Sequence, residues 1–264
     1  MDGREVDCTE SGPDVRTVQV IAGVVAAACI CFAASQMESY LDEAQKAIRR
    51  PIRVSEMPDT RVELGLTTVK PDEVLIQIQN GLPHDLRDDV LAHELGHVLL
   101  RARGFHGGRG GLTQAGMNRN RTFMMVTAET ISNCYEDPLA DAEATKHGFH
   151  PERIGDFIAS GVEQQATMFD IYAREKDDEL WPNYEATYLY CIELRPHMFK
   201  ESELEQKFAV EPKIGKLKHK LTKELGASRC RSPRECFERS KHLRDVAGFG
   251  GLITLSDPIS GVQE

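Results

Sequence analysis

Three residues that could bind a metal ion and activate water stand close together in the stretch VLAHELGHVLL, residues 90–100. His93 and His97 are four residues apart, so on a helix both imidazoles lie on one face and can reach a single ion. Glu94 lies beside that face, where its carboxylate can take a proton from water without binding the metal. Zinc lowers the pKa of a bound water, which then attacks a carbonyl group. The spacing therefore predicts zinc-assisted hydrolysis, with His93 and His97 as ligands and Glu94 as general base.

The residues around this motif are apolar on nearly every side. Val90, Leu91, Leu95 and the run 98–100 surround the polar residues, which predicts a buried helix. Buried imidazole and carboxylate groups need hydrogen-bond partners or a metal ion. The competing interpretation is a pair of satisfied core histidines with a buried salt bridge, and we favour the metal site over it.

A catalytic zinc ion needs a third protein ligand, and its fourth position stays open for water. Leu100 and Arg103 stand where a metzincin would have glycine and histidine, which excludes that class. The best later segment is NCYEDPLADAEATKHGF, 133–149, in which Asp137 and Asp141 share one helical face. We predict that Asp137 binds the metal and that Asp141 accepts the free N–H of a ligand histidine.

Other acidic residues near Asp137 compete for the role of third ligand. Asp137 precedes Pro138 and is also an ideal helix N-cap, a role that needs no metal. Glu136 is the commoner ligand type, but the residue four positions on is Ala140, which cannot orient a histidine. Glu129 is also within reach. The choice stays open among these three acids, with Asp137 preferred.

VLAHELGHVLL followed by DPLAD resembles the gluzincin side of the zincin metallopeptidases, and most of all the minigluzincins and the Ste-type (CAAX protease) zinc peptidases. The family's ligand helix carries Glu-x-x-Ala-Asp, and Asp137 stands where that glutamate would be. The resemblance covers residues 70–150 and implies an α+β zincin-like domain with a small sheet, an active-site helix and a ligand helix. It also implies that VLIQIQN, 74–80, is an edge strand to which an extended peptide could add.

The rest of the chain predicts the elements that would position this site. Short β-branched or alternating runs predict strands over 51–57, 60–66 and 74–80. Asp85 is predicted to cap the motif helix, and the glycine-rich stretch 104–116 to be a flexible flap. Helices are further predicted over residues 17–48, 122–134, 137–147, 152–161, 163–175, 184–195 and 202–225.

The length of 264 residues predicts one catalytic domain with appendages. We expect an N-terminal tail and apolar helix over 1–50, the catalytic domain over 51–165, and a helical extension over 166–264. Seven scattered cysteines do not suggest a disulfide scaffold, although Cys230 and Cys236 could close a small loop.

Charge and hydropathy limit the partners. A net charge of −10 argues against nucleic-acid binding. Basic residues crowd 213–244, which is typical of a solvated helix surface, with a docking face for an acidic partner as the alternative. The apolar run 18–34 is barely long enough to span a membrane and follows an acidic stretch, unlike a signal peptide. A buried helix and a cytoplasmic location are favoured, and membrane association through 18–34 is the alternative.

These features predict a zinc metalloendopeptidase that hydrolyses peptide or protein substrates. The alternative is a non-catalytic zinc-binding regulatory or interaction protein on a peptidase scaffold. A peptidase also needs a donor that stabilises the oxyanion of the tetrahedral intermediate. The candidates for that donor are His147, His150, Tyr184, Tyr188, Tyr190 and His197.

Overall fold

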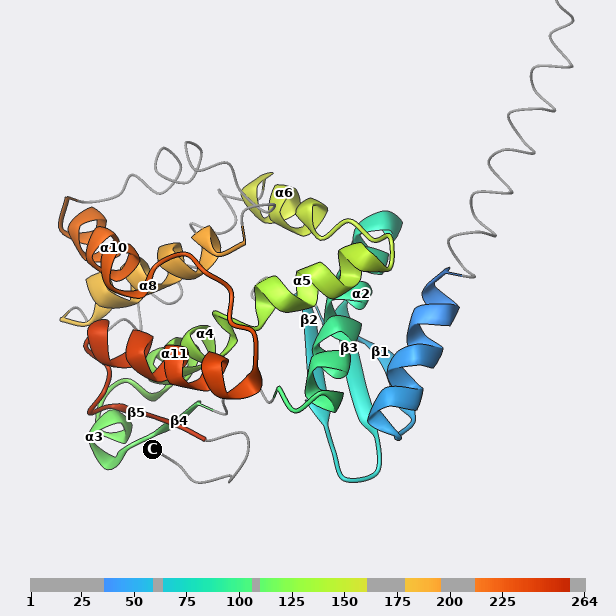
Figure 1. Cartoon of the computed structure of the whole chain (residues 1–264), viewed down its shortest axis with the longest axis horizontal. Helices are drawn as coiled ribbons and strands as arrows, with labels where there is room; N and C mark the ends of the chain where they lie inside the picture. The colour runs from blue at the N-terminus through green and yellow to red at the C-terminus, as the bar shows by residue number, and fades with distance from the viewer. Residues whose placement is uncertain (1–35, 59–63, 106–109, 161–178, 196–211, 257–264) are drawn as a thin grey trace, which may run out of the picture. The chain divides into compact units, whose positions relative to one another are not determined.

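The protein combines helices with two small sheets, as expected for a mixed α+β chain (Figure 1). The structure is a computed structural model that describes residues 36–58, 64–105, 110–160, 179–195 and 212–256. By its internal contacts the chain divides into residues 1–39 and 40–264, and the site described below belongs to the second unit. The expected domain boundaries near residues 50 and 165 stay a prediction.

The predicted N-terminal helix is described only in its last part. Residues 36–48 are helical and the helix ends before Pro51, as predicted. The apolar run 18–34 lies outside the described residues. Within the described ranges, no helix has both the length and the apolar character needed to cross a membrane.

A three-stranded sheet supports the motif helix. Its strands are β1 (Ile52–Met57), β2 (Gly65–Val69) and β3 (Val74–Gln79), in the order β1-β3-β2. β1 runs parallel to β3, whereas β2 is antiparallel to it. Of the predicted strand 60–66, residues 60–63 lie outside the described residues, and its last two residues are the first two of β2.

The expectation that VLIQIQN is an edge strand is wrong. β3 lies in the centre of the sheet with backbone partners on both sides. The physical reason is that Val74, Ile76 and Ile78 form one buried face, which edge and central strands share, whereas sheet neighbours pair with the backbone and leave no such pattern in the sequence. Among the described strands of this sheet, β2 and β1 form the edges.

The motif lies in α2 (His84–Ala102), a helix that is buried along most of its length. Pro83 occupies the N-cap position and no side chain caps the first turn, so the prediction that Asp85 caps this helix is wrong. Asp85 instead lies in the first turn, where the positive end of the helix dipole and the negative carboxylate attract each other and stabilise the helix.

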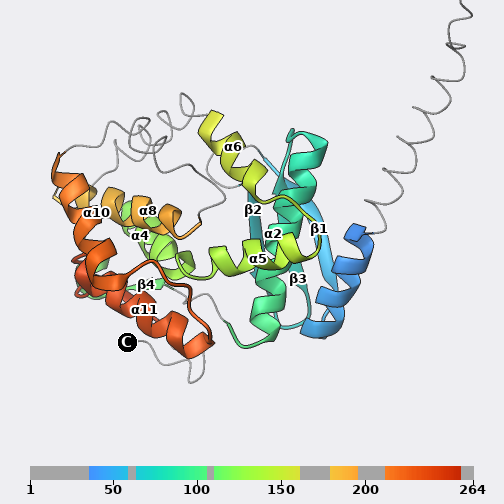
Figure 2. The same ribbon diagram turned by 45° about the horizontal axis from the view of Figure 1, so that its top comes forward.

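α2 packs against α5 (Asp137–Lys146), which crosses it in both ribbon views (Figures 1 and 2). The two helices come close together at Gly96, inside the His-Glu-x-x-His motif. A Cβ atom at this position would lie 2.6 Å from the carbonyl oxygen and 2.9 Å from the Cα atom of Ala140. Glycine therefore lets the backbone of α5 come close enough to face the histidines of α2.

The C-terminal part of the described chain has a hydrophobic core of its own. It contains α4 (Arg121–Asn133), α8 (Trp181–Glu193), α10 (Pro212–Leu225) and α11 (Pro233–Val246). α6 (Glu152–Ser160) follows α5. The predicted helices at 122–134 and 184–195 match α4 and α8 closely, whereas α11 was not predicted. The predicted helix 163–175 and the first part of 202–225 lie outside the described residues.

The prediction of a flexible flap over 104–116 is wrong for its second half. β4 (Gly110–Leu112) pairs with β5 (Ile253–Leu255), and the short helix α3 (Gln114–Met117) follows. A Cβ atom on Gly110 would lie 2.7 Å from Cβ and 2.8 Å from the carbonyl oxygen of Ala128. This glycine allows close contact between strand and helix, which explains its presence in an ordered element.

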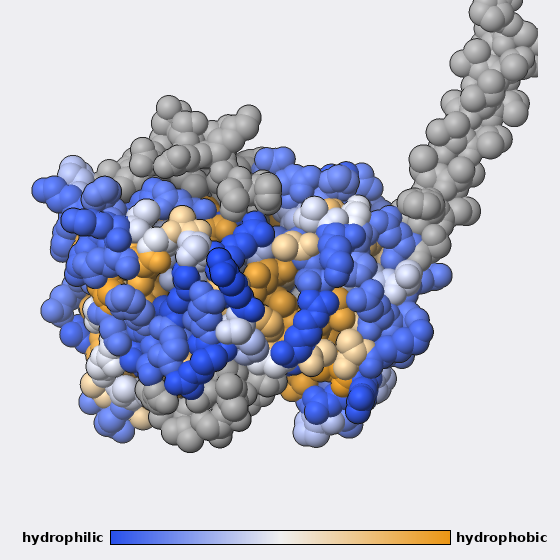
Figure 3. Space-filling model, in the orientation of Figure 1, coloured by the Kyte–Doolittle hydropathy of each residue, from blue (hydrophilic) through white to orange (hydrophobic). Residues whose placement is uncertain are grey.

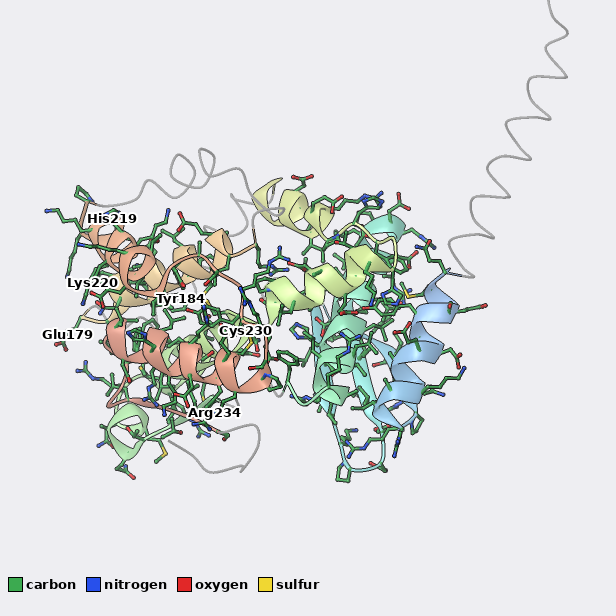
Figure 4. All side chains as sticks on the ribbon, viewed as in Figure 1. Glu179, Tyr184, His219, Lys220, Cys230 and Arg234 are labelled. Carbon is green, nitrogen blue, oxygen red and sulfur yellow. A yellow bond between two sulfur atoms is a disulfide. The ribbon has the colours of Figure 1, made fainter. Side chains whose placement is uncertain are left out.

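The basic segment lies on α10 and α11. Some of its residues form ion pairs, as Lys218 does with Glu193 and Arg239 does with Glu235. His219 and Lys220 point outward from α10 (Figure 4), and the surface over this helix is strongly hydrophilic (Figure 3). These features agree with a solvated helix surface, and docking of an acidic partner stays a prediction.

Two disulfides lie in this part of the chain. Cys134, directly after α4, is bonded to Cys191 of α8, and Cys230 is bonded to Cys236. The first pair was not predicted, because its cysteines are 57 residues apart and share no local pattern. The cytoplasmic location favoured from the sequence stays a prediction.

Removing the Cys134–Cys191 bond should lower the free energy of unfolding by about 2–4 kcal/mol, because the bond closes a long loop in the unfolded chain. The measurement is urea unfolding of the variant in which both cysteines are alanine. The matched control replaces Cys230 and Cys236, which are six residues apart, and should lose less, about 2 kcal/mol. An unchanged urea midpoint for the Cys134 and Cys191 variant would contradict this prediction.

Candidate metal centre

The two motif histidines aim their ring nitrogens at the same point. Nε2 of His93 lies 3.1 Å from Nε2 of His97. The other ring nitrogen of His93, Nδ1, lies 2.8 Å from Oδ1 of Asp141. That contact fixes the ring of His93 and leaves the lone pair of its Nε2 for a ligand.

Asp137 completes a group that could hold a metal ion. One of its carboxylate oxygens, Oδ1, lies 3.3 Å from Nε2 of His97. The ligand atoms of His93, His97 and Asp137 all lie within 4.8 Å of one another, and this is the one such group among the described residues. The side chains of His97 and Asp137 are 19% and 26% exposed, so the group can be reached from solvent.

The position of Asp137 also bears on its alternative role as a helix cap. Glu136 occupies the N-cap position of α5, and no side chain caps this end of the helix. Asp137 is the first residue of the helix itself, and its carboxylate faces His97. The capping role expected from the Asp-Pro sequence is therefore wrong, which leaves the carboxylate available to a metal.

The other two acids are placed differently. Glu136 is buried, and burial raises its pKa to about 7 despite the opposing charges of His97 and Arg101. Glu129 is an exposed residue of α4. Neither belongs to the group of potential ligand atoms in the described part of the chain.

The electrostatics of the group reflect close contact between opposite charges. Burial favours neutral His97, but its hydrogen bond with Asp137 and the charges of nearby carboxylates outweigh burial and raise its pKa to about 9. Burial also opposes ionisation of Asp137 and Asp141. The His97 contact and the Arg195 charge nevertheless hold the pKa of Asp137 low, and Arg195 and His93 hold the pKa of Asp141 low.

The raised pKa of His97 predicts a strong pH dependence of metal binding. Below about pH 9 the metal-free site holds a proton on His97, and a metal must displace it to reach the nitrogen. The apparent affinity for a divalent metal should therefore rise about tenfold per pH unit and level off above about pH 9. Competition titrations at three pH values between 6.5 and 8.5 would measure this slope, and a flat profile would contradict it.

Sequence reasoning missed Arg195, which lies just after α8. Its Nε and Nη2 atoms donate to Oδ2 and Oδ1 of Asp141 at 2.7 and 2.9 Å, and Nη1 lies 3.4 Å from Oδ2 of Asp137. A guanidinium bound in this two-pronged way fixes the plane of a carboxylate. Arg195 thus holds Asp141 against His93 and offsets the negative charge of the two aspartates. No local pattern could reveal it, since it is 54 residues from Asp141.

Glu94 has one hydrogen-bond partner that the sequence did not reveal. The hydroxyl of Thr67 on β2 donates to Oε2 of Glu94 at 2.6 Å. Glu94 is 7% exposed, so its carboxylate is well shielded from bulk water. The general base predicted from the sequence therefore contacts β2, an edge strand among the described strands, and its charge helps to raise the pKa of His97.

Among the proposed oxyanion donors, Tyr188 of α8 has the metal group in its surroundings. Burial raises the pKa of its phenol, and the charges of Arg195 and Asp137 act on it in opposite directions. His197 lies outside the described residues. The other candidates contact different partners: His147 pairs with Glu43, His150 with Glu152, Tyr184 with Phe123, and Tyr190 with Tyr135. Figure 4 shows Tyr184 within the group of C-terminal helices.

The chain matches no protein-family model, no curated protein and no solved structure.

Proposed function

We propose that the protein is a zinc-dependent peptidase with Glu94 as its general base. The observation that carries the proposal is the group of His93, His97 and Asp137, with the carboxylate of Glu94 on the same helix. Two imidazoles and one carboxylate are the ligand set of many catalytic zinc sites. The arrangement supports the gluzincin-like reading of the sequence, with Asp137 in place of the family's glutamate.

The spacing of the donor atoms supports zinc as the metal. Ligand atoms at 2.0–2.1 Å from a tetrahedral zinc ion lie about 3.3 Å from one another. The His93–His97 and His97–Asp137 separations are 3.1 and 3.3 Å. Asp141 and Arg195 stand behind the ligands and fix their orientation, as carboxylate partners of ligand histidines do.

The chemistry follows from the positions of the protein groups. Zinc, when bound, acts as a Lewis acid that lowers the pKa of water and polarises a carbonyl group. Glu94 accepts a proton from the attacking water and can pass it to the leaving amine. Burial of Glu94 keeps other waters from its carboxylate. Tyr188 is the described side chain that we assign to the developing oxyanion, since its hydroxyl can donate a hydrogen bond.

The exposure of the site supports catalysis over a purely structural metal. A structural zinc is usually closed by four protein ligands, whereas a catalytic one keeps a position open. The described residues offer three ligands, and His97 and Asp137 keep part of their surface exposed. A non-catalytic zinc protein stays the alternative that the experiment below must exclude.

The sheet suggests how a substrate would be held. β2 is an edge strand and contacts α2 beside Glu94. An extended peptide could pair with the backbone groups of β2 that point away from β3, its one partner among the described strands, as in other cases of β-strand addition. The substrate we propose is therefore an extended segment of a peptide or an unfolded protein, placed along β2 and not along β3.

The test is to remove and restore the metal. The full-length protein is incubated with a library of unstructured peptides, and cleavage is followed by mass spectrometry before chelation, after chelation and after addition of one equivalent of zinc. We expect cleavage to disappear on chelation and to return with zinc. Stoichiometric zinc binding without cleavage of any peptide would instead support the non-catalytic alternative.

A further inference from the structure

The carboxylate of Glu94 is held from the sheet side by a pair of residues on β2. Thr67 donates its hydroxyl to Oε2 at 2.6 Å. Gly65 lies two residues earlier, and alternate residues of a strand face the same side. Both positions therefore face α2, and they face the same glutamate.

Gly65 matters because it lacks a side chain. A Cβ atom at this position would lie 2.7 Å from Oε1 and 2.8 Å from Cγ of Glu94, and 2.8 Å from Cγ1 of Val90. Carbon atoms in proteins do not approach other heavy atoms so closely without displacement of one of them. Any residue larger than glycine at position 65 would push β2 away from α2 or turn Glu94 out of its place.

We propose that Gly65 and Thr67 form a cradle that positions Glu94 for proton transfer, with Thr67 as a positioning residue. The inference rests on the proposed peptidase function. A free glutamate side chain samples several rotamers, and the hydroxyl of Thr67 selects one of them. A carboxylate has about four acceptor sites and Thr67 uses one, so Glu94 keeps the capacity to accept a proton from water.

The cradle also links substrate binding to the base. β2 is the edge strand along which the extended substrate is proposed to lie, and the same strand holds Glu94. A substrate that pairs with β2 would hold the strand firmly against α2. The base would then be ordered most strongly when substrate is present, so the cradle should affect kcat more than KM.

The experiment compares Thr67→Val with Thr67→Ser in the zinc-loaded, full-length protein. Valine keeps the shape of threonine but removes the hydroxyl, and we expect kcat to fall about 10–100-fold, as small misplacements of reacting groups do. KM and zinc content should stay near wild-type values. Serine keeps the hydroxyl and should recover most of the lost kcat. A kcat for Thr67→Val within about twofold of the wild type would overturn the proposal.

A matched control is available on α10. The hydroxyl of Thr222 also donates to a glutamate, Oε2 of Glu193 at 3.3 Å, and neither residue belongs to the group of potential metal ligands. Thr222→Val should leave kcat unchanged. Gly65→Ala gives a second, independent test: it should lower kcat with unchanged zinc content, whereas full activity in this variant would count against the cradle.

Failure of the cradle can be told apart from failure of the proposed function. If the wild type cleaves peptides and Thr67→Val does so equally well, only the cradle is wrong. If the wild type cleaves nothing, the peptidase proposal fails, and crystal structures of the zinc-loaded wild type and Thr67→Val still decide about the cradle. We expect Glu94 to change rotamer in the variant, and an unchanged carboxylate position would overturn the inference.

Discussion

Replacing Glu94 with glutamine is expected to abolish peptide hydrolysis while zinc stays bound. Glutamine has nearly the same shape but cannot accept a proton from the attacking water, and loss of a general base typically costs about 10²–10⁴-fold in rate. Glu94 is not one of the three grouped ligands, so zinc content should not change. The measurements are kcat on a cleaved peptide and zinc per protein by mass spectrometry.

Asp85→Asn is a suitable control for this variant. It makes the same type of change on the same helix, at an exposed residue in the first turn, and should leave kcat unchanged. Full hydrolysis by the Glu94→Gln variant would exclude Glu94 as the base. Loss of zinc from that variant would instead place Glu94 among the ligands.

The second large effect is expected at Asp137. Replacing it with alanine removes one of three ligand atoms. Loss of a residue that only supports a ligand typically weakens metal binding about 10–100-fold, and Asp137→Ala should weaken zinc binding by more than that. Asp141→Asn weakens such a supporting contact to His93, and the zinc affinity of this variant should be about 10–100-fold lower than that of the wild type. Zinc affinities are measured by competition with a chromophoric chelator at one pH.

Glu136→Gln is the matched control, because it changes the adjacent acid. Its side chain is buried and lies outside the ligand group, so zinc affinity should stay close to that of the wild type. Strong loss of zinc from Glu136→Gln with normal binding by Asp137→Ala would reverse the assignment. Equal retention in both variants would remove both residues from the site.

The local features of the site could be predicted from the sequence. The apolar surroundings of His93 and Glu94 predict a buried helix, and α2 is buried along this stretch. The four-residue spacing of Asp137 and Asp141 predicts a shared helical face, and both carboxylates lie beside the histidines. Such inferences succeed because they depend on helix geometry, in which neighbours are fixed by sequence separation.

Contacts between distant segments could not be predicted in this way. Arg195 reaches Asp141 across 54 residues, and Thr67 reaches Glu94 across 27. An arginine and a threonine carry no periodic signal that would assign them to a metal site. The order of strands in the sheet depends on the same kind of long-range contact, which is why VLIQIQN could be recognised as a strand but was wrongly expected at the edge.

X-ray absorption spectroscopy of the zinc-loaded, full-length protein tests the central claim most directly. We predict one zinc ion per chain with two histidine nitrogens, one carboxylate and one exchangeable water at about 2.0–2.1 Å. His93, His97 and Asp137 supply the protein ligands, so the Asp137→Ala spectrum should lose one protein oxygen. A site closed by four protein ligands, or a spectrum unchanged by Asp137→Ala, would contradict the proposed centre.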